Sequence, residues 1–418
     1  MSELASRPSP VSGAERIVAL DVLRGVAILG ILVMNVQSFA MPFAAYSNPH
    51  GWGGEPTAVD LLVWAFAHLF AEQKFMTLFS ILFGAGAALM LDRLQAKGLP
   101  AARVHYRRMG GLILIGAAHG YLLWYGDILF GYGVCGLLLY PFRNVRPARL
   151  LAVGFVVLCV APAIGQGFGL YLSQLPAEQQ AELMAGMVPS DEAVAYEVET
   201  YRQGWLAQMR HRVPTSLAFQ TVFLLLFTFW RALGLMLVGM ALYRWAVITA
   251  GRSPGLYRRL ALWGFGLGLP ICVAGLLLIV AREFDFQVVW LVAGVVNYLG
   301  SLGVSLGYLA LVMLWCLSEA PSAATAAVRR SLAAVGRMAL TNYLLQTVLC
   351  VFVFYGGLGL GLFGHVSRLE QWLVVLAVWG FQLLVSPWWL ERFRFGPAEW
   401  LWRTMTYLRP QPMRRSLS

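Results

Sequence analysis

The feature that most limits what this chain can fold into is a series of apolar runs, each close to twenty residues long. An α-helix needs a run of about this length to cross the roughly 30 Å hydrocarbon layer of a bilayer. Of the 418 residues, 59% are hydrophobic and 12% are charged, against roughly 25% charged in a soluble domain. These values exclude a soluble enzyme, a disordered chain and an ordinary nucleic-acid-binding domain. They predict an all-α fold, a polytopic transmembrane bundle of about ten helices.

Ten runs are long enough for spanning helices. They lie at about 17–40, 72–91, 109–125, 127–142, 150–171, 217–243, 260–281, 288–317, 333–355 and 370–390. The segment 58–71 is apolar but short, so we interpret it as an interfacial or re-entrant segment that leads into the second helix. The chain is therefore divided into an N-terminal tail (1–16), a transmembrane domain (17–390) with one long outer loop (172–213), and a basic C-terminal tail (391–418).

The positions of lysine and arginine indicate the orientation of these helices. With the N-terminus inside, most of the 31 Lys and Arg residues fall in inside segments, which agrees with the excess of positive charge in cytoplasmic loops. Both termini are therefore predicted to be cytoplasmic. The net charge of +11 adds attraction to anionic membrane lipids, and no nucleic-acid partner is expected.

Polar residues inside the first predicted span are candidate functional residues. An ionisable side chain at the bilayer centre costs about 2.5–3.5 kcal/mol on insertion scales, so it needs a partner or a wet cavity. Asp21 and Arg24 are three apart and can pair along one helix face. Arg24 and Asn35 share a face, about 16 Å apart along the axis. The structural alternative is an ion pair at the helix end with one amide contact between helices.

Histidine supplies the candidate general bases. His119, near the outer end of the span 109–125, is the best candidate inside a span, because imidazole titrates near neutrality. Asp127 follows a turn at Gly126 and is expected to cap the next helix. His50 lies in the loop outside the first span, where it is either a base or an ordinary loop residue. A hydrogen-bonded structural role remains the alternative for His119.

A second group of charged residues suggests a substrate or anion site. Arg231, near the middle of the span 217–243, has no carboxylate within a turn, so its partner comes from another helix or from a bound anion. Glu72 and Lys74 stand at the entrance of the span 72–91. The five cysteines all fall in predicted spans without metal-ligand spacing, so neither a disulfide framework nor a metal is expected.

The motifs that carry these residues resemble a known family. LDVLRGVAILGILVMNVQSFAMP, FMTLFSILFGAG, HGYLLWYGDIL and SPWWLERFRFGPAEWLWR look like the YeiB family of bacterial inner-membrane proteins, whose function is unknown. That family is similar in its first helix to membrane acyltransferases such as heparan-alpha-glucosaminide N-acetyltransferase, which moves an acetyl group from cytosolic acetyl-coenzyme A to a sugar amine. The spacing of Arg24 and Asn35 matches that pattern, and Tyr46 stands where that enzyme has a histidine.

The resemblance implies a transmembrane acyltransferase that moves an acyl group from a coenzyme A thioester to an envelope glycan, a lipid or a small-molecule acceptor. The expected catalytic residues are Asn35, His119, His50 and Asp127. The expected cofactor is acetyl-CoA or another acyl-CoA, held by Arg24, Asp21, Arg103, Arg107 and Arg108, since arginine binds phosphates well. Two alternatives stay open, a transporter or permease with a polar intramembrane pathway and a non-catalytic membrane assembly partner. A homodimer is compatible with each of them.

Overall fold

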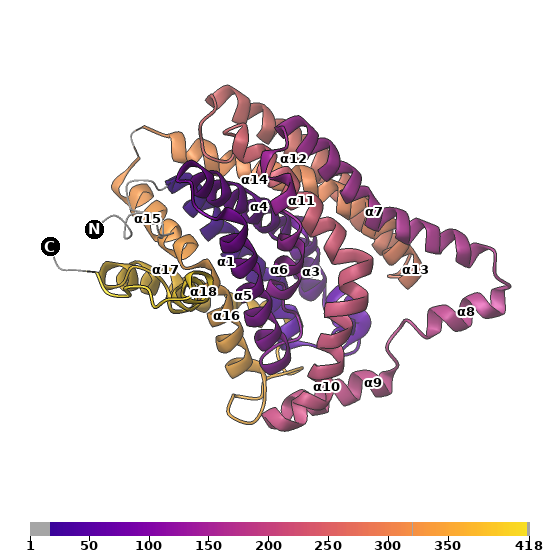
Figure 1. Cartoon of the computed structure of the whole chain (residues 1–418). Coiled ribbons are helices and arrows are strands. Elements are labelled where there is room, and N and C mark those ends of the chain that lie inside the picture. The colour runs from indigo at the N-terminus through magenta and orange to yellow at the C-terminus, as the bar shows by residue number, and fades with distance from the viewer. Residues whose placement is uncertain (1–16, 320, 416–418) are drawn as a thin grey trace.

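A computed structural model describes residues 17–319 and 321–415 of the chain. Within these residues the fold is α-helical, and the only extended pairing is an isolated bridge between Phe393 and Arg414. The helices pack side by side in one bundle, with α15 and α18 at one end and α8 and α9 at the other (Figure 1). The prediction of an all-α bundle is confirmed. The predicted N-terminal tail, 1–16, lies outside the described residues.

Seven of the described segments are long and apolar enough to cross a membrane. They are α1 (Val18–Ala40), α3 with α4 (Ala58–Phe70, Lys74–Ala96), α7 (Pro147–Ser173), α10 with α11 (Trp205–Ala218, Phe229–Arg244), α12 (Pro254–Ala281), α13 with α14 (Phe286–Val288, Gly294–Leu317) and α17 (Arg368–Arg392). An eighth is the pair α15 (Ala323–Arg337) and α16 (Ala339–Phe354), bent by 85°. Large apolar side chains such as Leu262 and Leu384 are exposed, as expected of a surface that contacts lipid.

The predicted spans 109–125 and 127–142 form a helical hairpin rather than two long apolar helices. In this hairpin α5 (Ala101–Leu122) packs against α6 (Leu129–Leu137), and Nε2 of His105 lies 2.8 Å from the carbonyl oxygen of Gly136. The nine residues of α6 extend only about 14 Å and cannot cross a bilayer alone. The prediction of a full helical span at 127–142 is therefore wrong. Pro141 follows within a short 3-10 helix, Tyr140–Asn144, because its ring and missing N–H disfavour a longer α-helix.

The segment 58–71 does not add a separate crossing. It forms α3, which begins with a capping box made by Thr57 and Asp60. Gln73, with a left-handed φ of 63°, interrupts the chain before α4 starts at Lys74. The two helices together make one apolar stretch, Ala58–Ala96, so α3 leads into the second span.

Helix α1 is central to the bundle and packs against α4, α15, α16 and α17 (Figure 1). Most of its side chains are buried, although α7 and α17 are largely exposed along their apolar windows. The approach of α15 is close because Gly25 and Gly336 face each other's backbones. A Cβ on Gly25 would lie 2.1 Å from the carbonyl oxygen of Leu332, and one on Gly336 would lie 1.9 Å from that of Asp21.

The outer loop and the C-terminal segment both contain further helices. Within 172–213 the chain forms α8 (Ala177–Ala185), α9 (Asp191–Arg202) and the start of α10, and a π-helical stretch, Phe219–Thr228, joins α10 to α11. A short helix, α2 (Ala44–Ser47), follows α1. Within 391–418 the chain forms α18 (Pro397–Tyr407), which packs against α5 and α16.

Candidate functional site

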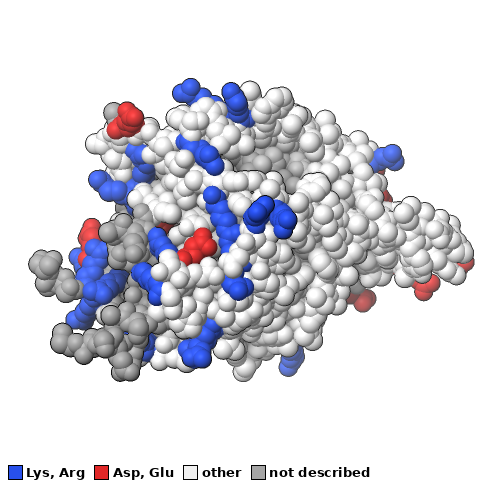
Figure 2. Space-filling view, turned by 45° about the horizontal axis from the view of Figure 1, so that its top comes forward, with Lys and Arg blue, Asp and Glu red and all other residues white. Residues whose placement is uncertain are grey.

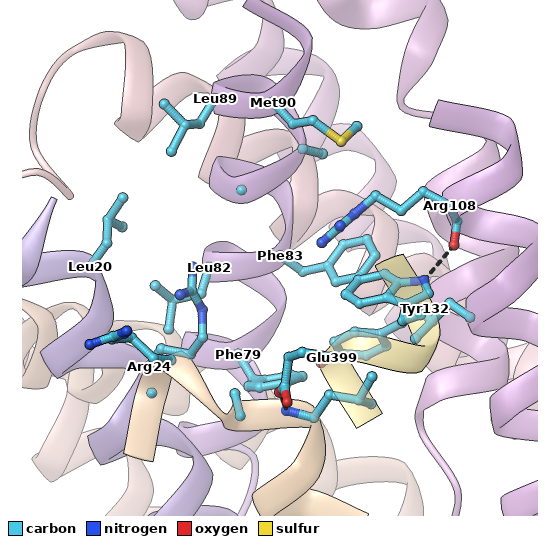
Figure 3. A pocket seen from close by; sticks show the side chains of 18 of the residues that line it. Leu20, Arg24, Phe79, Leu82, Phe83, Leu89, Met90, Arg108, Tyr132 and Glu399 are labelled. Atoms are coloured by element: carbon cyan, nitrogen blue, oxygen red, sulfur yellow. Dashed lines mark hydrogen bonds between the residues drawn. The ribbon is translucent and has the colours of Figure 1, made fainter. Parts of the chain in front are cut away.

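A pocket opens at the end of the bundle where the described chain begins and ends. Its volume is about 260 Å³, and Ile17 and Tyr407 both line it. Leucine, phenylalanine and methionine side chains from α1, α4 and α5 form much of the wall, and arginines project from several helices (Figure 3). Lys and Arg side chains also gather over this end of the molecule, whereas the arm formed by α7 and α8 carries acidic side chains (Figure 2). We call this feature the basic pocket.

Five arginines and two carboxylates line the basic pocket. They are Arg24, Arg93, Arg108, Arg337 and Arg403, with Asp21 and Glu399. The pair predicted along the first helix is present, because Nη1 of Arg24 lies 2.9 Å from Oδ1 of Asp21. The excess of guanidinium groups favours an anionic ligand.

Helices α5 and α18 meet at Arg108. The guanidinium of Arg108 stacks 3.6 Å from the ring centre of Trp402, and Trp402 Nε1 donates a 2.7 Å hydrogen bond to the carbonyl oxygen of Arg108. Arg103 and Arg107, which were grouped with Arg108, are exposed on α5 and do not line the pocket. Of the three arginines predicted on this helix, Arg108 alone lines the pocket.

Glu399 joins α18 to the start of α16. Its Oε1 accepts hydrogen bonds from the backbone N–H groups of Leu340 (2.7 Å) and Thr341 (3.1 Å), which satisfies two free donors at the N-terminus of that helix. Burial raises the pKa of Glu399, and the hydrogen bonds from Thr341 act in the opposite direction. The sequence did not point to Glu399 and Arg403 because the segment 391–418 was interpreted as a basic tail. The spacing of Glu399, Trp402 and Arg403 along one helix face is the signal that indicates a packed helix.

His119 is held in a buried chain of three side chains. Its Nδ1 lies 2.7 Å from Oδ2 of Asp127, and its Nε2 lies 2.9 Å from Oγ1 of Thr347 on α16. The side chains of His119 and Asp127 are 1% and 0% exposed. The other oxygen of Asp127 accepts a 2.8 Å hydrogen bond from the N–H of Phe130, so Asp127 serves the first turn of α6 as well.

Tyr343 connects this chain to the basic pocket. The rings of Tyr343 and His119 are 5.2 Å apart, and Tyr343 is one of the residues that line the pocket. Tyr343 and Thr347 are four apart on α16, so they share a face of that helix. The imidazole therefore lies directly behind the pocket wall. An imidazole between a carboxylate and a hydroxyl is an arrangement that supports proton transfer.

Asn35 lies on the side of His119 that is remote from the basic pocket. It is half-buried on α1 and does not line the pocket. One turn further along the same face is Phe39, whose ring stacks 4.1 Å from that of Trp124. The ring of Trp124 is 6.4 Å from that of His119. Asn35 therefore shares a helix face with Phe39, which packs against Trp124, the neighbour of His119.

His50 has surroundings that share no residue with those of His119. Its Nδ1 lies 3.3 Å from Oε2 of Glu55, and its ring packs 5.1 Å from that of Phe284. Its side chain is 40% exposed in a short 3-10 helix, Pro49–Gly51, that follows α2. The structure therefore does not bring the two candidate bases together.

The charged residues around α4 form a separate buried cluster. Nζ of the fully buried Lys74 donates 2.7 Å hydrogen bonds to Oδ1 of Asn297 and to the carbonyl oxygen of His68, and Glu72 pairs with the imidazole of His68. These contacts connect α4 to α3 and α14. Glu72, Lys74 and Arg231, the residues predicted for a substrate or anion site, do not line the basic pocket.

Arg231 obtains its partners from neighbouring helices rather than from a carboxylate. Its Nη2 donates 2.8 Å hydrogen bonds to Thr77 and Ser301, and its guanidinium lies 4.0 Å from the ring centre of Tyr298. Arg231 thereby joins α11 to α4 and α14.

The bundle and its pocket define a polytopic α-helical membrane protein with an arginine-rich pocket at one end. The chain belongs to the YeiB family. It is 35% identical to the uncharacterized protein YeiB of Escherichia coli K12 over 94% of this chain and 96% of that protein. It is 30% identical to the uncharacterized protein YxaH of Bacillus subtilis 168 over 97% of each chain.

A family model described as "Protein of unknown function (DUF418)" matches residues 242–409. This match includes Tyr343, Thr347, Glu399 and Arg403, and it begins after His119 and Arg24. The family likeness over the N-terminal half rests on the two full-length relatives. None of the three descriptions names an activity.

Proposed function

We propose that this protein is a membrane acyltransferase that takes an acyl group from a coenzyme A thioester at the basic pocket and transfers it with the help of His119. The observation that carries the proposal is the position of the Asp127–His119 pair directly behind Tyr343, a wall residue of the pocket. A buried base beside an anion-binding pocket is the arrangement that thioester transfer requires.

The basic pocket suits the donor in charge and in shape. A coenzyme A thioester carries phosphates at one end and an acyl chain on a narrow arm at the other. The arginines suit the phosphates, and the apolar wall suits the arm and the acyl group. The volume of about 260 Å³ is below the usual 300–1,000 Å³ of a site for a drug-sized ligand, so the pocket accommodates the arm and leaves the nucleotide at the mouth.

The proposed chemistry uses the tautomer that Asp127 selects. With the carboxylate accepting the hydrogen of Nδ1, Nε2 is free to accept a proton from a hydroxyl or amine. The acceptor takes the place that the hydroxyl of Thr347 now holds and attacks the thioester carbonyl. His119 receives the acceptor's proton and returns it to the departing thiolate, so the products are an acylated acceptor and free coenzyme A. Asn35, the oxyanion donor expected from the sequence, does not line the pocket proposed to hold the thioester, so this step assigns it no role.

The orientation in this proposal follows the charge distribution. The arginine-rich end faces the cytoplasm, as the bias of Lys and Arg towards cytoplasmic loops predicts, and the cap of α8, α9 and α10 faces outwards. The inner membrane of a bacterium is the proposed location, and the donor comes from the cytoplasm.

Binding of acetyl-CoA to purified protein in detergent tests the proposal. We expect thermal stabilisation that increases with ligand concentration, and about a tenfold loss of affinity in Arg108→Gln, since a hydrogen bond to a charged group contributes about 1.5–3 kcal/mol. Arg107→Gln is the matched control, because Arg107 lies beside Arg108 in sequence but outside the pocket. Vesicles of anionic lipid serve as the competing phosphate source.

Two results would count against the proposal. Equal loss of affinity in the two variants would show that general surface charge, and not the pocket, binds the coenzyme. Saturation of the pocket by anionic lipid, with no displacement by acetyl-CoA, would assign the pocket to lipid headgroups.

A transporter is the second candidate function, and the buried cluster around Lys74 and Arg231 is the observation that favours it. Buried ionisable groups in membrane proteins often mark transport or proton pathways. Reconstituted protein that moves a substrate between compartments without consuming a thioester would support this alternative over the first.

A further inference from the structure

A second group of unusual residues lies on the opposite side of His119 from the basic pocket. Trp124 and Tyr125 come from the turn between α5 and α6, Tyr201 from α9, Phe219 from the π-helical stretch, and Tyr355 follows α16. We call these five residues the outer aromatic cluster. Its side chains come from segments that are far apart in the sequence, so it forms only when the outer cap is seated on the bundle.

The rings of the cluster form a continuous set of contacts. Tyr125 lies 6.1 Å from Trp124, 5.6 Å from Phe219 and 6.4 Å from Tyr201, and Tyr201 lies 4.5 Å from Tyr355. Trp124 is the member nearest His119, at 6.4 Å between ring centres. The cluster therefore extends from the candidate base towards the outer cap.

Several polar atoms in and beside the cluster are buried and have no hydrogen-bond partner among the residues that the structure describes. They are Nε1 of Trp124, the hydroxyls of Tyr125 and Tyr355, Nε2 of Gln220 and Nε of Arg212. Each of these residues is at least nine-tenths buried. A buried polar group that lacks a partner is costly, so such groups are usually satisfied by bound water or by a ligand.

Gln220 places one of these unpartnered atoms beside the catalytic candidates. A Cβ on Gly120 would lie 2.6 Å from Nε2 of Gln220 and 3.5 Å from Cβ of Asp127. The amide therefore borders the Asp127–His119 pair across the glycine. A ligand that hydrogen-bonds to Gln220 would lie within reach of that pair.

The charges around the cluster favour a neutral ligand. Among the described residues, Arg212 and Glu197 are the fully charged types buried there, and the imidazole of His211 lies beside the cluster, with its Nδ1 3.3 Å from the hydroxyl of Tyr201. The terminal nitrogens of Arg212 donate to the carbonyl oxygen of Leu122 (2.8 Å) and to Oε1 of Gln208 (2.6 Å). Glu197 accepts hydrogen bonds from the N–H of Phe43. The described residues around the cluster carry no excess of positive charge like that of the basic pocket. Binding of an anion here would therefore gain little electrostatic free energy.

We propose that the outer aromatic cluster binds a neutral, polyhydroxylated molecule of the saccharide class and presents one of its hydroxyls to His119. A hydroxyl group both donates and accepts hydrogen bonds. A ligand with several hydroxyls can therefore bond to the N–H donors and to the tyrosine hydroxyls of the protein that lack partners. The apolar faces of a sugar ring match aromatic faces. Sugar binding at the cluster does not depend on the proposed function. The delivery of a sugar hydroxyl to His119 does rest on the proposed acyl transfer.

Sugar binding to the intact protein in lipid nanodiscs tests the proposal. The probes are glucose, N-acetylglucosamine and trehalose, with cyclohexanol as a ring that bears a single hydroxyl and phosphate as an anion. We expect at least one sugar to raise the melting temperature at concentrations up to about 50 mM, and the two control probes to leave it unchanged. The proposal is overturned if no sugar stabilises the protein, or if cyclohexanol or phosphate stabilises it equally.

The double variant Tyr125→Phe with Tyr355→Phe removes two unpartnered hydroxyls and keeps the rings. We expect it to lose sugar affinity at least tenfold. Tyr257→Phe is the matched control, because the buried hydroxyl of Tyr257 donates a 2.8 Å hydrogen bond to the carbonyl oxygen of Val247 away from the cluster. We expect this control to keep full sugar affinity. Equal affinity in the double variant and the control would overturn the proposal.

Stability without any ligand supplies an independent readout. Removing an unpartnered hydroxyl should leave the melting temperature unchanged or raise it, whereas Tyr257→Phe should lower it. If Tyr125→Phe lowers it as much as Tyr257→Phe, the hydroxyl has a permanent partner such as a structural water, and the proposal fails. Acetyl-CoA affinity measured on the same samples separates the two proposals. Sugar binding with no coenzyme binding would refute only the acyl transfer, and the reverse would refute only the cluster's role.

Discussion

The basic pocket and the outer aromatic cluster are both near His119, and they differ in almost every physical respect. The pocket has five arginines against two carboxylates around an open volume. The cluster has aromatic rings with unpartnered hydroxyl, indole and amide groups and no excess of charge. Tyr343, a residue of the pocket lining, packs against the imidazole on one side, and Trp124 is the member of the cluster nearest the imidazole. The two proposals together assign ligands of different chemistry to the two regions, with His119 as the base that both ligands would reach.

The largest effect is expected from substitution of His119, which lies next to both regions. His119→Gln should lower the rate of thioester cleavage by about 10²- to 10⁴-fold, the contribution of a positioned general base. Acetyl-CoA and sugar affinities should stay within a factor of two, because neither region depends on His119 for binding. The rate of free thiol formation from acetyl-CoA measures the effect.

His105→Gln is the control for this prediction. His105 is buried on the same helix, and its Nε2 lies 2.8 Å from the carbonyl oxygen of Gly136, a contact that glutamine can keep. It should retain the rate. If both variants lose it equally, the loss reflects damage to α5 and not removal of a base.

An intermediate effect is expected from salt, which should separate the two regions without any mutation. Binding to five arginines is weakened by screening, since the Debye length falls from about 10 Å at 0.1 M to about 3 Å at 1 M. Over that range, acetyl-CoA affinity should decrease by about tenfold, and sugar affinity should change little. Titrations of each ligand at low and high salt provide the test. An equal response of the two ligands would remove the electrostatic distinction on which the comparison rests.

The most local effect concerns pH and is confined to the outer side. Burial raises the pKa of Glu197 to about 7, from an ordinary value of 4.5. Between these two values the native state holds more protons than the unfolded state, so the contribution of Glu197 to stability falls as pH rises and is constant above about 7. The total change is at most about 3 kcal/mol. After correction for the intrinsic pH dependence of exchange, the amides of α9 should therefore be less protected at pH 8 than at pH 5.

Glu197→Gln supplies the control for this pH dependence. The amide keeps an oxygen that can accept from the N–H of Phe43, but it does not titrate. Its α9 exchange, corrected for the intrinsic pH dependence of exchange, should be the same at both values. A pH response that persists in this variant would assign the effect to another group.

Helical character and several local contacts could be predicted from the sequence. The apolar runs predicted the all-α bundle, and the three-residue spacing of Asp21 and Arg24 predicted their ion pair. The hydrogen bond that the first turn of α6 donates to Asp127 followed from its place after the turn at Gly126, although the N-cap residue itself is Ile128. These features depend on residues close together in the chain, so periodicity and turn chemistry are sufficient for them.

Features that depend on distant segments could not be predicted in this way. The contact of His119 with Thr347 requires α16 to pack beside α5, and 228 residues separate the two in sequence. The selection of Arg108 over Arg107 depends on where Trp402 is placed by α18. The hairpin of α5 and α6 was missed because nine residues of helix and a proline-containing turn have the composition of a span. The unpartnered atoms of the outer cluster exist only in the packed structure.

The sidedness of thioester cleavage tests the central claim most directly. Protein is reconstituted in proteoliposomes of one orientation, acetyl-CoA is supplied on one side at a time, and free thiol is measured with a sugar present on both sides. The account predicts thiol release only when acetyl-CoA is supplied at the arginine-rich end. Release with the donor at the outer end, or no release from either side, would contradict it.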